Sequence, residues 1–216
     1  MNNKQNYKLV LFDMDGTLIK NRTIFVISEK KGFKNRLMKT LESNKEPYQK
    51  SIEIAKFLKG FDRRELLEIF REIPLQKNIV TIAEKLKENS ITTAIITDSY
   101  QFFADDLKKR LHFDFAFANT LITQQNIITG KLLLNNTTRQ PCGKGKIYSI
   151  CKEVILGQLC KKLNIKNTET IAVGDGIVDI GMIKKAGVGI AYKAPGEVQK
   201  YADVITNDLS DILEYI

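Results

Sequence analysis

The sequence has few of the residues on which several classes of functional site depend. His112 is the only histidine among 216 residues, so a Ser-His or Cys-His mechanism and a multi-histidine metal site have little basis. It stands in Leu-His-Phe-Asp-Phe, among core-type residues, which favours a structural role. No apolar segment approaches the roughly 20 residues that a membrane span needs. Internal repeats and low-complexity tracts are also absent from the sequence.

Cysteine is scarce and its spacing does not suit a metal site. Cys142, Cys151 and Cys160 are odd in number and form no Cys-x-x-Cys pair. On a helix, nine steps of about 100° would place consecutive cysteines on opposite faces, where they cannot share a metal. We expect reduced core cysteines, as in a cytosolic protein. The polar start of the chain shows no signal peptide, which also favours a cytoplasmic location.

Acidic residues are outnumbered by basic ones. The chain has 34 Lys plus Arg and 25 Asp plus Glu, a formal net charge of +9. A basic surface for nucleic acid or membrane is one interpretation, and a lysine-rich surface that attracts small anions is another. The basic residues are scattered, without a basic arm or zinc-finger spacing. We therefore expect a small anionic ligand, and neither nucleic acid nor membrane, as partner; the oligomeric state is not indicated.

Strand-like and helical patterns alternate along most of the chain. Residues 113–140 hold short strand-like pieces with turn signals between them. Apolar strand-like runs occupy residues 8–12, 91–96, 170–173, 188–192 and 203–206, and helical patterns occupy 77–89, 101–111, 146–163, 177–186 and 208–215. This alternation predicts an α/β fold, a Rossmann-like parallel sheet with helices on both faces.

Residues 22–73, after the first strand, have a different pattern. Apolar residues at helical spacing, interrupted near Gly32, residues 43–47, Gly60 and Pro74, predict four short helices and no strand. Four such helices within an alternating chain indicate an inserted all-helical cap. We predict a discontinuous core domain of residues 1–20 and 75–216 and a helical cap domain of residues 21–74.

Polar residues follow three of the predicted strands. Asp13 and Asp15 follow the first, Thr97 the second and Asp175 the third, and Asp179 lies one helical turn after Asp175. The carboxyl ends of neighbouring parallel strands meet at one edge of a sheet. Four carboxylates gathered there would repel one another, and Mg²⁺ removes that conflict because it prefers oxygen ligands. The sequence therefore predicts a site for Mg²⁺ and a phosphoryl group, where an aspartate can act as nucleophile.

Three motifs resemble those of a known family. The run from Asp13 to Thr17 (Asp-Met-Asp-Gly-Thr) resembles the first signature of the haloacid dehalogenase (HAD) superfamily of phosphatases. Residues 95–99 are similar to its second motif, and residues 174–179 resemble its acidic fourth motif. Order and spacing match over nearly the whole chain. The closest branch is phosphoserine phosphatase-like, which has a helical cap between the first and second motifs.

The resemblance implies a role for each of these residues. Asp13 is the nucleophile and a Mg²⁺ ligand, and Asp15 is the general acid and base whose backbone carbonyl also binds the ion. Thr97 hydrogen-bonds a phosphoryl oxygen. Asp175 binds Mg²⁺, and Asp179 supports the ion directly or through another ligand. Family dehalogenases lack a carboxylate at the position of Asp15, so its presence favours hydrolysis of phosphate esters.

The third motif is a single lysine, for which Lys144, Lys146 and Lys152 are candidates. The distance to the fourth motif in the resembling branch favours Lys152. Residues 143–146 (Gly-Lys-Gly-Lys) lack the spacing of a phosphate-binding loop. We also expect Asp98 and Arg22 to contact the substrate, together with Thr97 and Lys152.

The chain departs from phosphoserine phosphatases at positions that contact the substrate. Arg22 stands where that branch has an acidic residue for the substrate ammonium, and the cap arginine for the carboxylate has no evident counterpart near residues 51–55. An arginine facing an ammonium is unfavourable. We predict a Mg²⁺-dependent phosphatase that forms an aspartyl-phosphate and hydrolyses a small phosphorylated metabolite other than phosphoserine. Phosphoserine phosphatase itself and a catalytically weak phosphate-binding regulatory protein are the alternatives.

Overall fold

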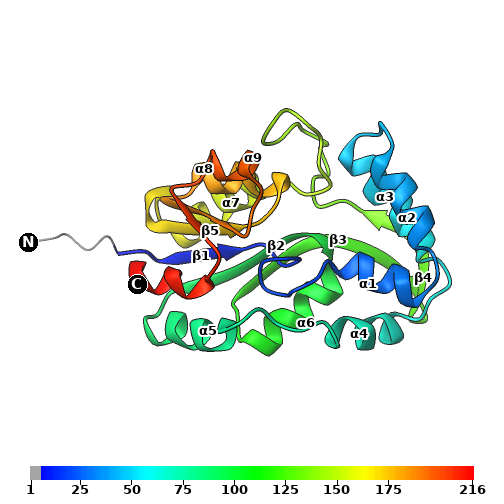
Figure 1. The fold of residues 1–216 in the computed structure, drawn as a ribbon, viewed down its shortest axis with the longest axis horizontal. Helices are drawn as coiled ribbons and strands as arrows, with labels where there is room; N and C mark the ends of the chain where they lie inside the picture. The colour runs from blue at the N-terminus through cyan, green and yellow to red at the C-terminus, as the bar shows by residue number, and fades with distance from the viewer. Residues whose placement is uncertain (1–5) are drawn as a thin grey trace, which may run out of the picture.

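The computed structural model describes residues 6–216, which form one seven-stranded sheet with helices on its two faces (Figure 1). The strand order is β4-β3-β2-β1-β5-β6-β7, and every neighbouring pair is parallel except the antiparallel β3–β4 hairpin. The predicted Rossmann-like α/β fold is confirmed. The strands are β1 (Leu9–Phe12), β2 (Thr92–Tyr100), β3 (Phe115–Gln124), β4 (Ile127–Leu133), β5 (Thr170–Gly174), β6 (Val188–Tyr192) and β7 (Val204–Thr206).

The central strand β1 is buried on both sides, which explains its uninterrupted apolar sequence. Val10 and Phe12 belong to the core shared with α5 (Ile79–Glu88) and α6 (Gln101–Leu111). Leu9 and Leu11 face the opposite core, which α7 (Lys152–Leu163) and α8 (Ile180–Lys185) cover. Short helical turns complete the chain: η1 (Asn167–Glu169), η2 (Ile177–Asp179), α9 (Gly196–Gln199) and η3 (Leu209–Tyr215).

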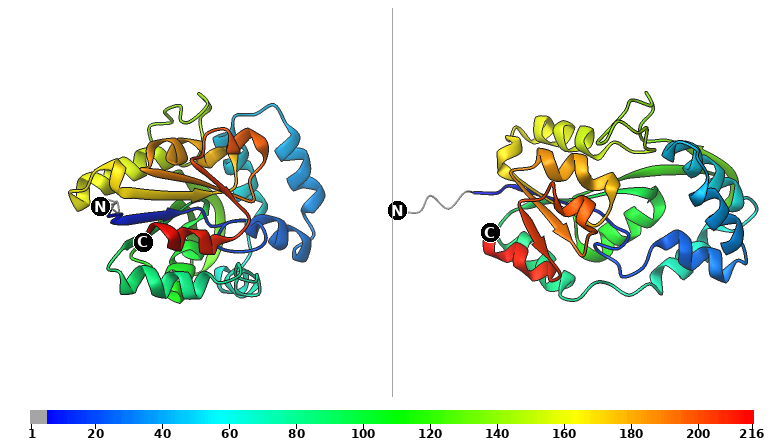
Figure 2. Two further views of the ribbon diagram at one scale, coloured as in Figure 1. Left: turned by 60° about the vertical axis from the view of Figure 1, so that its left-hand side comes forward. Right: turned by 45° about the horizontal axis from the view of Figure 1, so that its top comes forward.

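Four helices lie between residues 23 and 71, as the apolar spacing predicts: α1 (Thr23–Lys30), α2 (Lys34–Glu42), α3 (Pro47–Phe57) and α4 (Arg63–Arg71). In both views of Figure 2, α1, α2 and α3 lie at the end of the sheet away from η3, where α3 packs against β4. Helix α4 instead packs on α6, where the rings of Phe70 and Phe103 stack with centroids 4.7 Å apart. The division into a core of residues 1–20 and 75–216 and a cap of residues 21–74 stays a prediction.

The segment before α7 differs from its prediction. The helix expected over residues 146–163 begins only at Lys152, and a loop runs from the end of β4 to that point. Gly143 and Gly145 have φ angles of +55° and +78°, which are not helical. The Asn136 side-chain amide donates to the carbonyls of Gln140 at 2.9 Å and Tyr148 at 3.0 Å. These contacts give the loop a fixed, folded-back path.

Because this segment is a loop, Cys142 and Cys151 do not lie on opposite faces of a helix as expected. Cys142 lies in this loop and forms a disulfide with Cys151, and their Cα atoms are 5.8 Å apart. The helical-face argument does not apply to a loop that turns back on itself. The prediction of reduced cysteines is therefore wrong for this pair, and Cys160 is the free, buried cysteine of the three.

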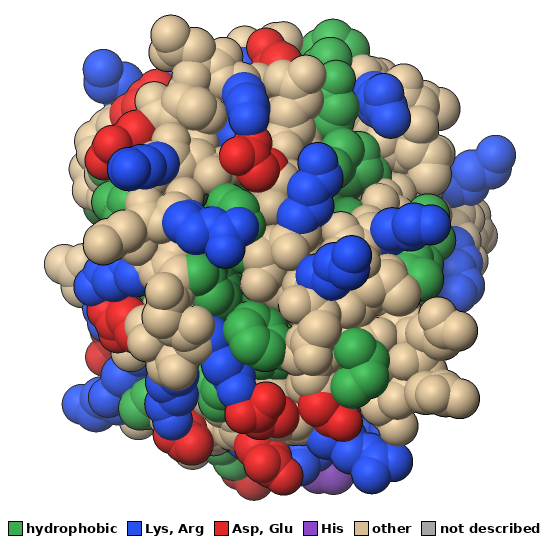
Figure 3. Space-filling view, turned by 90° about the vertical axis from the view of Figure 1, so that its right-hand side faces the viewer, with side chains coloured by type: hydrophobic (Ala, Val, Ile, Leu, Met, Phe, Trp, Pro, Cys, Tyr) green, Lys and Arg blue, Asp and Glu red, His purple; other side chains and the backbone are tan. Residues whose placement is uncertain are grey.

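The basic side chains are scattered over the surface, as the sequence predicts. On the face in Figure 3, Lys and Arg side chains are spread over the surface, with acidic and hydrophobic side chains between them. Within residues 6–216, no helix has both the length and the apolar character to cross a membrane. A cytoplasmic location and the absence of nucleic-acid and membrane partners stay predictions.

Packing between β6 and α8 gives a test of the sheet. A Cβ added at Gly189, on β6, would lie 2.3 Å from the carbonyl oxygen of Ile183, on α8. We expect Gly189→Ala to lower the free energy of unfolding by about 1–3 kcal/mol, because backbone cannot move aside without shifting the helix. Urea denaturation measures the change. Gly196→Ala, where a Cβ meets nothing within 4 Å, is the control, and equal denaturation midpoints would contradict the packing argument.

Candidate active site

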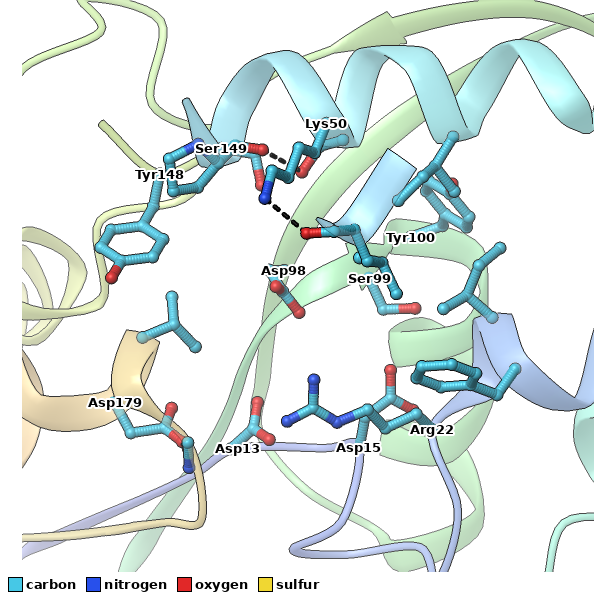
Figure 4. A pocket seen from close by; sticks show the side chains of 18 of the residues that line it. Asp13, Asp15, Arg22, Lys50, Asp98, Ser99, Tyr100, Tyr148, Ser149 and Asp179 are labelled. Carbon is cyan, nitrogen blue, oxygen red and sulfur yellow. Dashed lines mark hydrogen bonds between the residues drawn. The ribbon is translucent and has the colours of Figure 1, made fainter. Parts of the chain in front are cut away.

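A pocket lies at the carboxyl ends of β1, β2 and β5. Its floor includes Asp13 and Asp15 after β1, Asp98 at the end of β2, and Asp175 and Asp179 after β5 (Figure 4). The pairing of β1 with both β2 and β5 brings these segments together, although Asp13 and Asp179 are 166 residues apart in the chain. The pocket has a volume of about 200 Å³. That is smaller than typical sites for drug-sized ligands and suits a small metabolite.

Lys152, the first residue of α7, connects two of the carboxylates from beneath the pocket. It is 1% exposed, and its Nζ donates to Oδ1 of Asp13 and to Oδ1 of Asp179, both at 2.5 Å. Burial favours the neutral amine, but the Asp13 and Asp179 charges outweigh it and raise the pKa of Lys152. Lys144 and Lys146 are exposed, and Lys144 pairs with Glu197. Of the three candidate lysines, the structure places Lys152 beside Asp13.

Asp179 holds the loop after β5 in place. Its second oxygen, Oδ2, accepts hydrogen bonds from the backbone N–H groups of Asp175 at 3.1 Å and Gly176 at 2.8 Å. A Cβ at Gly174 would lie 2.4 Å from the Asp179 carboxyl carbon, so this approach requires glycine. Asp179 therefore fixes both Lys152 and the residues around Asp175.

The carboxylates of Asp13, Asp175 and Asp179 are suited to a hard cation. Each offers an oxygen, and these oxygens lie within 4.8 Å of one another. Burial raises the pKa of Asp13 well above its usual value and also raises that of Asp175, and the Asp179 charge adds to both shifts. Charged carboxylates at this separation are unfavourable without a cation. An all-oxygen donor set of this kind fits Mg²⁺.

Asp15 has a partner that the sequence analysis missed. Thr23, the first residue of α1, donates to Oδ1 of Asp15 from its backbone N–H at 2.9 Å and from its hydroxyl at 2.5 Å. Burial raises the pKa of Asp15 to about 6 even though both hydrogen bonds from Thr23 oppose the shift. A carboxyl group with this pKa can hold or release a proton near neutral pH. A threonine at a helix start, where backbone N–H groups are free, was the available signal.

Gln76 is a second residue that the sequence did not indicate. Its Nε2 donates to the carbonyl of Gly16 at 2.9 Å, and its Oε1 accepts from the Tyr192 hydroxyl at 2.9 Å. Gly16 has a φ of +94°, which allows the turn directly after Asp15. Gln76 thus ties the turn that presents Asp13 and Asp15 to β6.

The remaining predicted residues lie at different depths. Thr97 is fully buried, and its hydroxyl accepts from the Ser99 N–H at 3.2 Å; Asp98 and Ser99 line the pocket beside it. Arg22 points toward the space between Asp13 and Asp98 (Figure 4). Burial acts to lower the pKa of Arg22, but the surrounding carboxylates, with Asp98 first, raise it. The contacts of Thr97, Asp98 and Arg22 with substrate stay predictions.

The sequence pattern of the family described as "haloacid dehalogenase-like hydrolase" matches residues 7–187. The chain belongs to this family. Phosphoserine phosphatase of Methanocaldococcus jannaschii is 30% identical over 97% of each chain, and that of Idiomarina loihiensis is 31% identical over 97% of this chain and 94% of its own. A solved structure titled "Phospho-Aspartyl Intermediate Analogue of Phosphoserine phosphatase" superimposes with a TM-score of 0.82 at 28% identity, covering 98% and 99% of the two chains. The predicted family and phosphatase class are confirmed.

The wall opposite the HAD motifs comes from the inserted helices and from the loop before α7. Backbone hydrogen bonding from Tyr48 N–H to the Ile147 carbonyl at 3.0 Å joins α3 to that loop. Asn119 on β3 donates to the Ser149 hydroxyl at 2.9 Å, which fixes the same loop from the sheet side. No sequence motif marks this wall, whose members are Ile24, Phe25, Leu41, Pro47, Lys50, Ser51, Ile54, Tyr148 and Ser149.

The choice among the candidate lysines can be tested directly. We expect Lys152→Met to lower kcat/KM for a generic aryl phosphate by about a hundredfold or more, because Asp13 and the reacting phosphoryl group lose a buried positive charge. The free energy of unfolding should also fall, by about 3–5 kcal/mol, since two buried carboxylates lose their partner. Lys144→Met is the control and should leave both quantities unchanged. The reverse result would assign the role to Lys144.

Proposed function

We propose that this HAD-family protein is a Mg²⁺-dependent phosphomonoesterase that transfers the phosphoryl group of a small ester to Asp13 and then to water. The observation that carries the proposal is the buried arrangement of Asp13, Lys152 and Asp179, with Asp175 beside them and Asp15 on the same turn. This arrangement supplies a nucleophile, a fixed positive charge, a cation site and a proton donor in one pocket. Its location at the carboxyl ends of the strands leaves it open to a ligand.

The proposed reaction has two steps. Lys152 binds Oδ1 of Asp13, so Oδ2 attacks phosphorus while the bond from phosphorus to the ester oxygen breaks. Asp15 donates its proton to that oxygen, and the alcohol leaves. Asp15, now charged, takes a proton from a water molecule that attacks phosphorus, which releases phosphate and restores the Asp13 carboxylate. The pKa of about 6 for Asp15 suits both transfers.

Asp13 and Asp175, with the backbone carbonyl of Asp15, are the residues that we propose to hold Mg²⁺. The ion would neutralise charge on the phosphoryl oxygens during transfer. Both oxygens of Asp179 already accept hydrogen bonds, from Lys152 and from two backbone N–H groups. Asp179 therefore acts mainly by positioning Lys152 and the Asp175 loop.

The nucleophile provides the first test of this function. We expect hydrolysis of an aryl phosphate that depends on Mg²⁺, and we expect Asp13→Asn to lower kcat by about a thousandfold or more because no aspartyl-phosphate can form. Phosphate retained on acid-quenched protein measures the intermediate. Glu197→Gln, on the surface, is the control. Phosphate binding without Mg²⁺-dependent turnover in the unmodified protein would instead support the regulatory alternative.

The pocket also bears on the substrate. Among the described residues that line it, the carboxylates are those of Asp13, Asp15, Asp98, Asp175 and Asp179. The catalytic proposal uses four of them, and Asp98 is the strongest electrostatic neighbour of Arg22. No carboxylate is therefore left for a substrate ammonium, which would lie near the Arg22 charge. We propose a phosphomonoester that carries an acidic group and no ammonium.

Phosphoserine is the second candidate substrate. The relatives at 30% and 31% identity are named phosphoserine phosphatase, and so is the structure that superimposes at a TM-score of 0.82. Sequence similarity over nearly the whole chain favours this candidate, whereas the charge of Arg22 opposes it.

The two substrates can be distinguished by one matched pair of esters. The phosphate ester of 3-hydroxypropanoate is phosphoserine without its ammonium. We expect its kcat/KM to exceed that of phosphoserine by about tenfold or more, because like charges placed side by side cost several kcal/mol. Arg22→Glu should reverse the preference, and Lys20→Glu, at an exposed position outside the pocket, should not. A preference of the unmodified protein for phosphoserine would establish the second candidate.

A further inference from the structure

Lys50 is a positive charge on the wall that faces the catalytic aspartates. It lies on α3, lines the pocket and is half-buried. In Figure 4 its ammonium points into the pocket from the side opposite Asp13 and Asp179, with Asp98 and Ser99 between. Its Nζ donates to the carbonyl of Leu41 at 2.6 Å, at the end of α2. This hydrogen bond holds the side chain in place and leaves two N–H groups for another acceptor.

No acidic side chain of residues 6–216 forms an ion pair with Lys50. The two glutamates nearest to it along α3 have other partners: Glu53 pairs with Lys45, and Glu46 accepts from the backbone N–H of Ile147 at 3.2 Å. A partly desolvated ammonium without a counter-charge favours an anionic ligand. The charge of Lys50 therefore remains available to a molecule in the pocket.

Apolar side chains line the wall of the pocket around Lys50. Ile54 lies one turn after Lys50 on α3 and is 8% exposed. Leu41, Ile24 and Phe25 line the same part of the pocket from α2 and α1. A short carbon chain placed there removes apolar surface from water, whereas a polyhydroxylated body would leave hydroxyl groups without partners.

We infer that Lys50 binds a carboxylate at the end of the substrate remote from the phosphate, so that the substrate is the phosphate ester of a short hydroxycarboxylic acid. This inference rests on the proposed function, whose floor binds the phosphoryl group. A carboxylate fits better than a second phosphate, because one ammonium matches one negative charge and the pocket has only about 200 Å³. In this arrangement Arg22 disfavours an ammonium near the phosphoryl end, and Lys50 selects the acid at the other end.

Two esters of equal chain length isolate the contact with Lys50. The phosphate ester of 3-hydroxypropanoate has the carboxylate, and propyl phosphate lacks it. We expect Lys50→Met to raise KM for the first ester by about tenfold or more, the loss typical of a hydrogen bond to a charged group, with little change in kcat. KM for propyl phosphate should stay the same, and Lys50→Arg should restore binding of the acid to within a few-fold. Lys56→Met, at an exposed position on the same helix, is the control.

The outcomes separate this inference from the proposed function. Equal changes for both esters would show that Lys50 only supports the wall, and no change for either would show that it does not contact the ligand; both results overturn the inference. Calorimetric binding of the acid ester to Asp13→Asn protein, with and without Lys50→Met, tests the contact independently of turnover. If neither ester is hydrolysed but Lys50→Met weakens binding of the acid ester about tenfold or more, the inference holds and the phosphatase proposal fails.

Discussion

The site depends on one buried ammonium group shared between two carboxylates. Lys152 is inaccessible to solvent, and its charge is compensated by Asp13, which follows β1, and by Asp179, which follows β5. A buried ion triplet of this kind tolerates no partial loss, since each remaining charge would lack a partner in a medium of low polarity. The arrangement therefore fixes the start of α7, the end of β1 and the loop after β5 relative to one another. This electrostatic constraint positions the carboxylate of Asp13, the proposed nucleophile.

The same constraint leaves an imbalance of charge on the pocket side. Lys152 neutralises part of the negative charge, while burial and the charge of Asp179 raise the pKa values of Asp13 and Asp175. The positive charge of Arg22 acts in the opposite direction and lowers the pKa of Asp175. A divalent cation and a phosphoryl group introduce charges of both signs, so together they can complete the balance without adding net repulsion. Under the proposed function, the ion and the ligand would therefore bind together.

Much of this arrangement could be predicted from the sequence, because it follows from the geometry of parallel strands. Asp13, Asp98 and Asp175 meet since their strands are adjacent and parallel, and the apolar runs before them identify those strands. The assignment of Lys152 among three lysines rests on resemblance alone, since nothing in the local sequence distinguishes a buried lysine from an exposed one.

The Cys142–Cys151 disulfide could not be predicted from the sequence. It depends on how residues 134–151 fold back, which the contacts of Asn136 and the φ angles of the glycines determine. Thr23 and Gln76 act through hydrogen bonds to the turn at Asp15 and Gly16, which no periodicity encodes.

In the proposed function, the groups that catalyse the reaction and the groups that select the substrate come from different parts of the chain. This separation explains why similarity to relatives identifies the reaction better than the substrate. The catalytic groups follow strands of the sheet, whose register allows little change of position. The facing wall is built from α1, α2 and α3, whose side chains must only fill the space and contact the part of the substrate that does not react. Under the proposed function, an exchange of charge beside this wall, as at Arg22, would alter which molecules are accepted while Asp13 and Lys152 stay in place. Relatives at about 30% identity can thus share the chemistry of the floor while the wall binds a different acid.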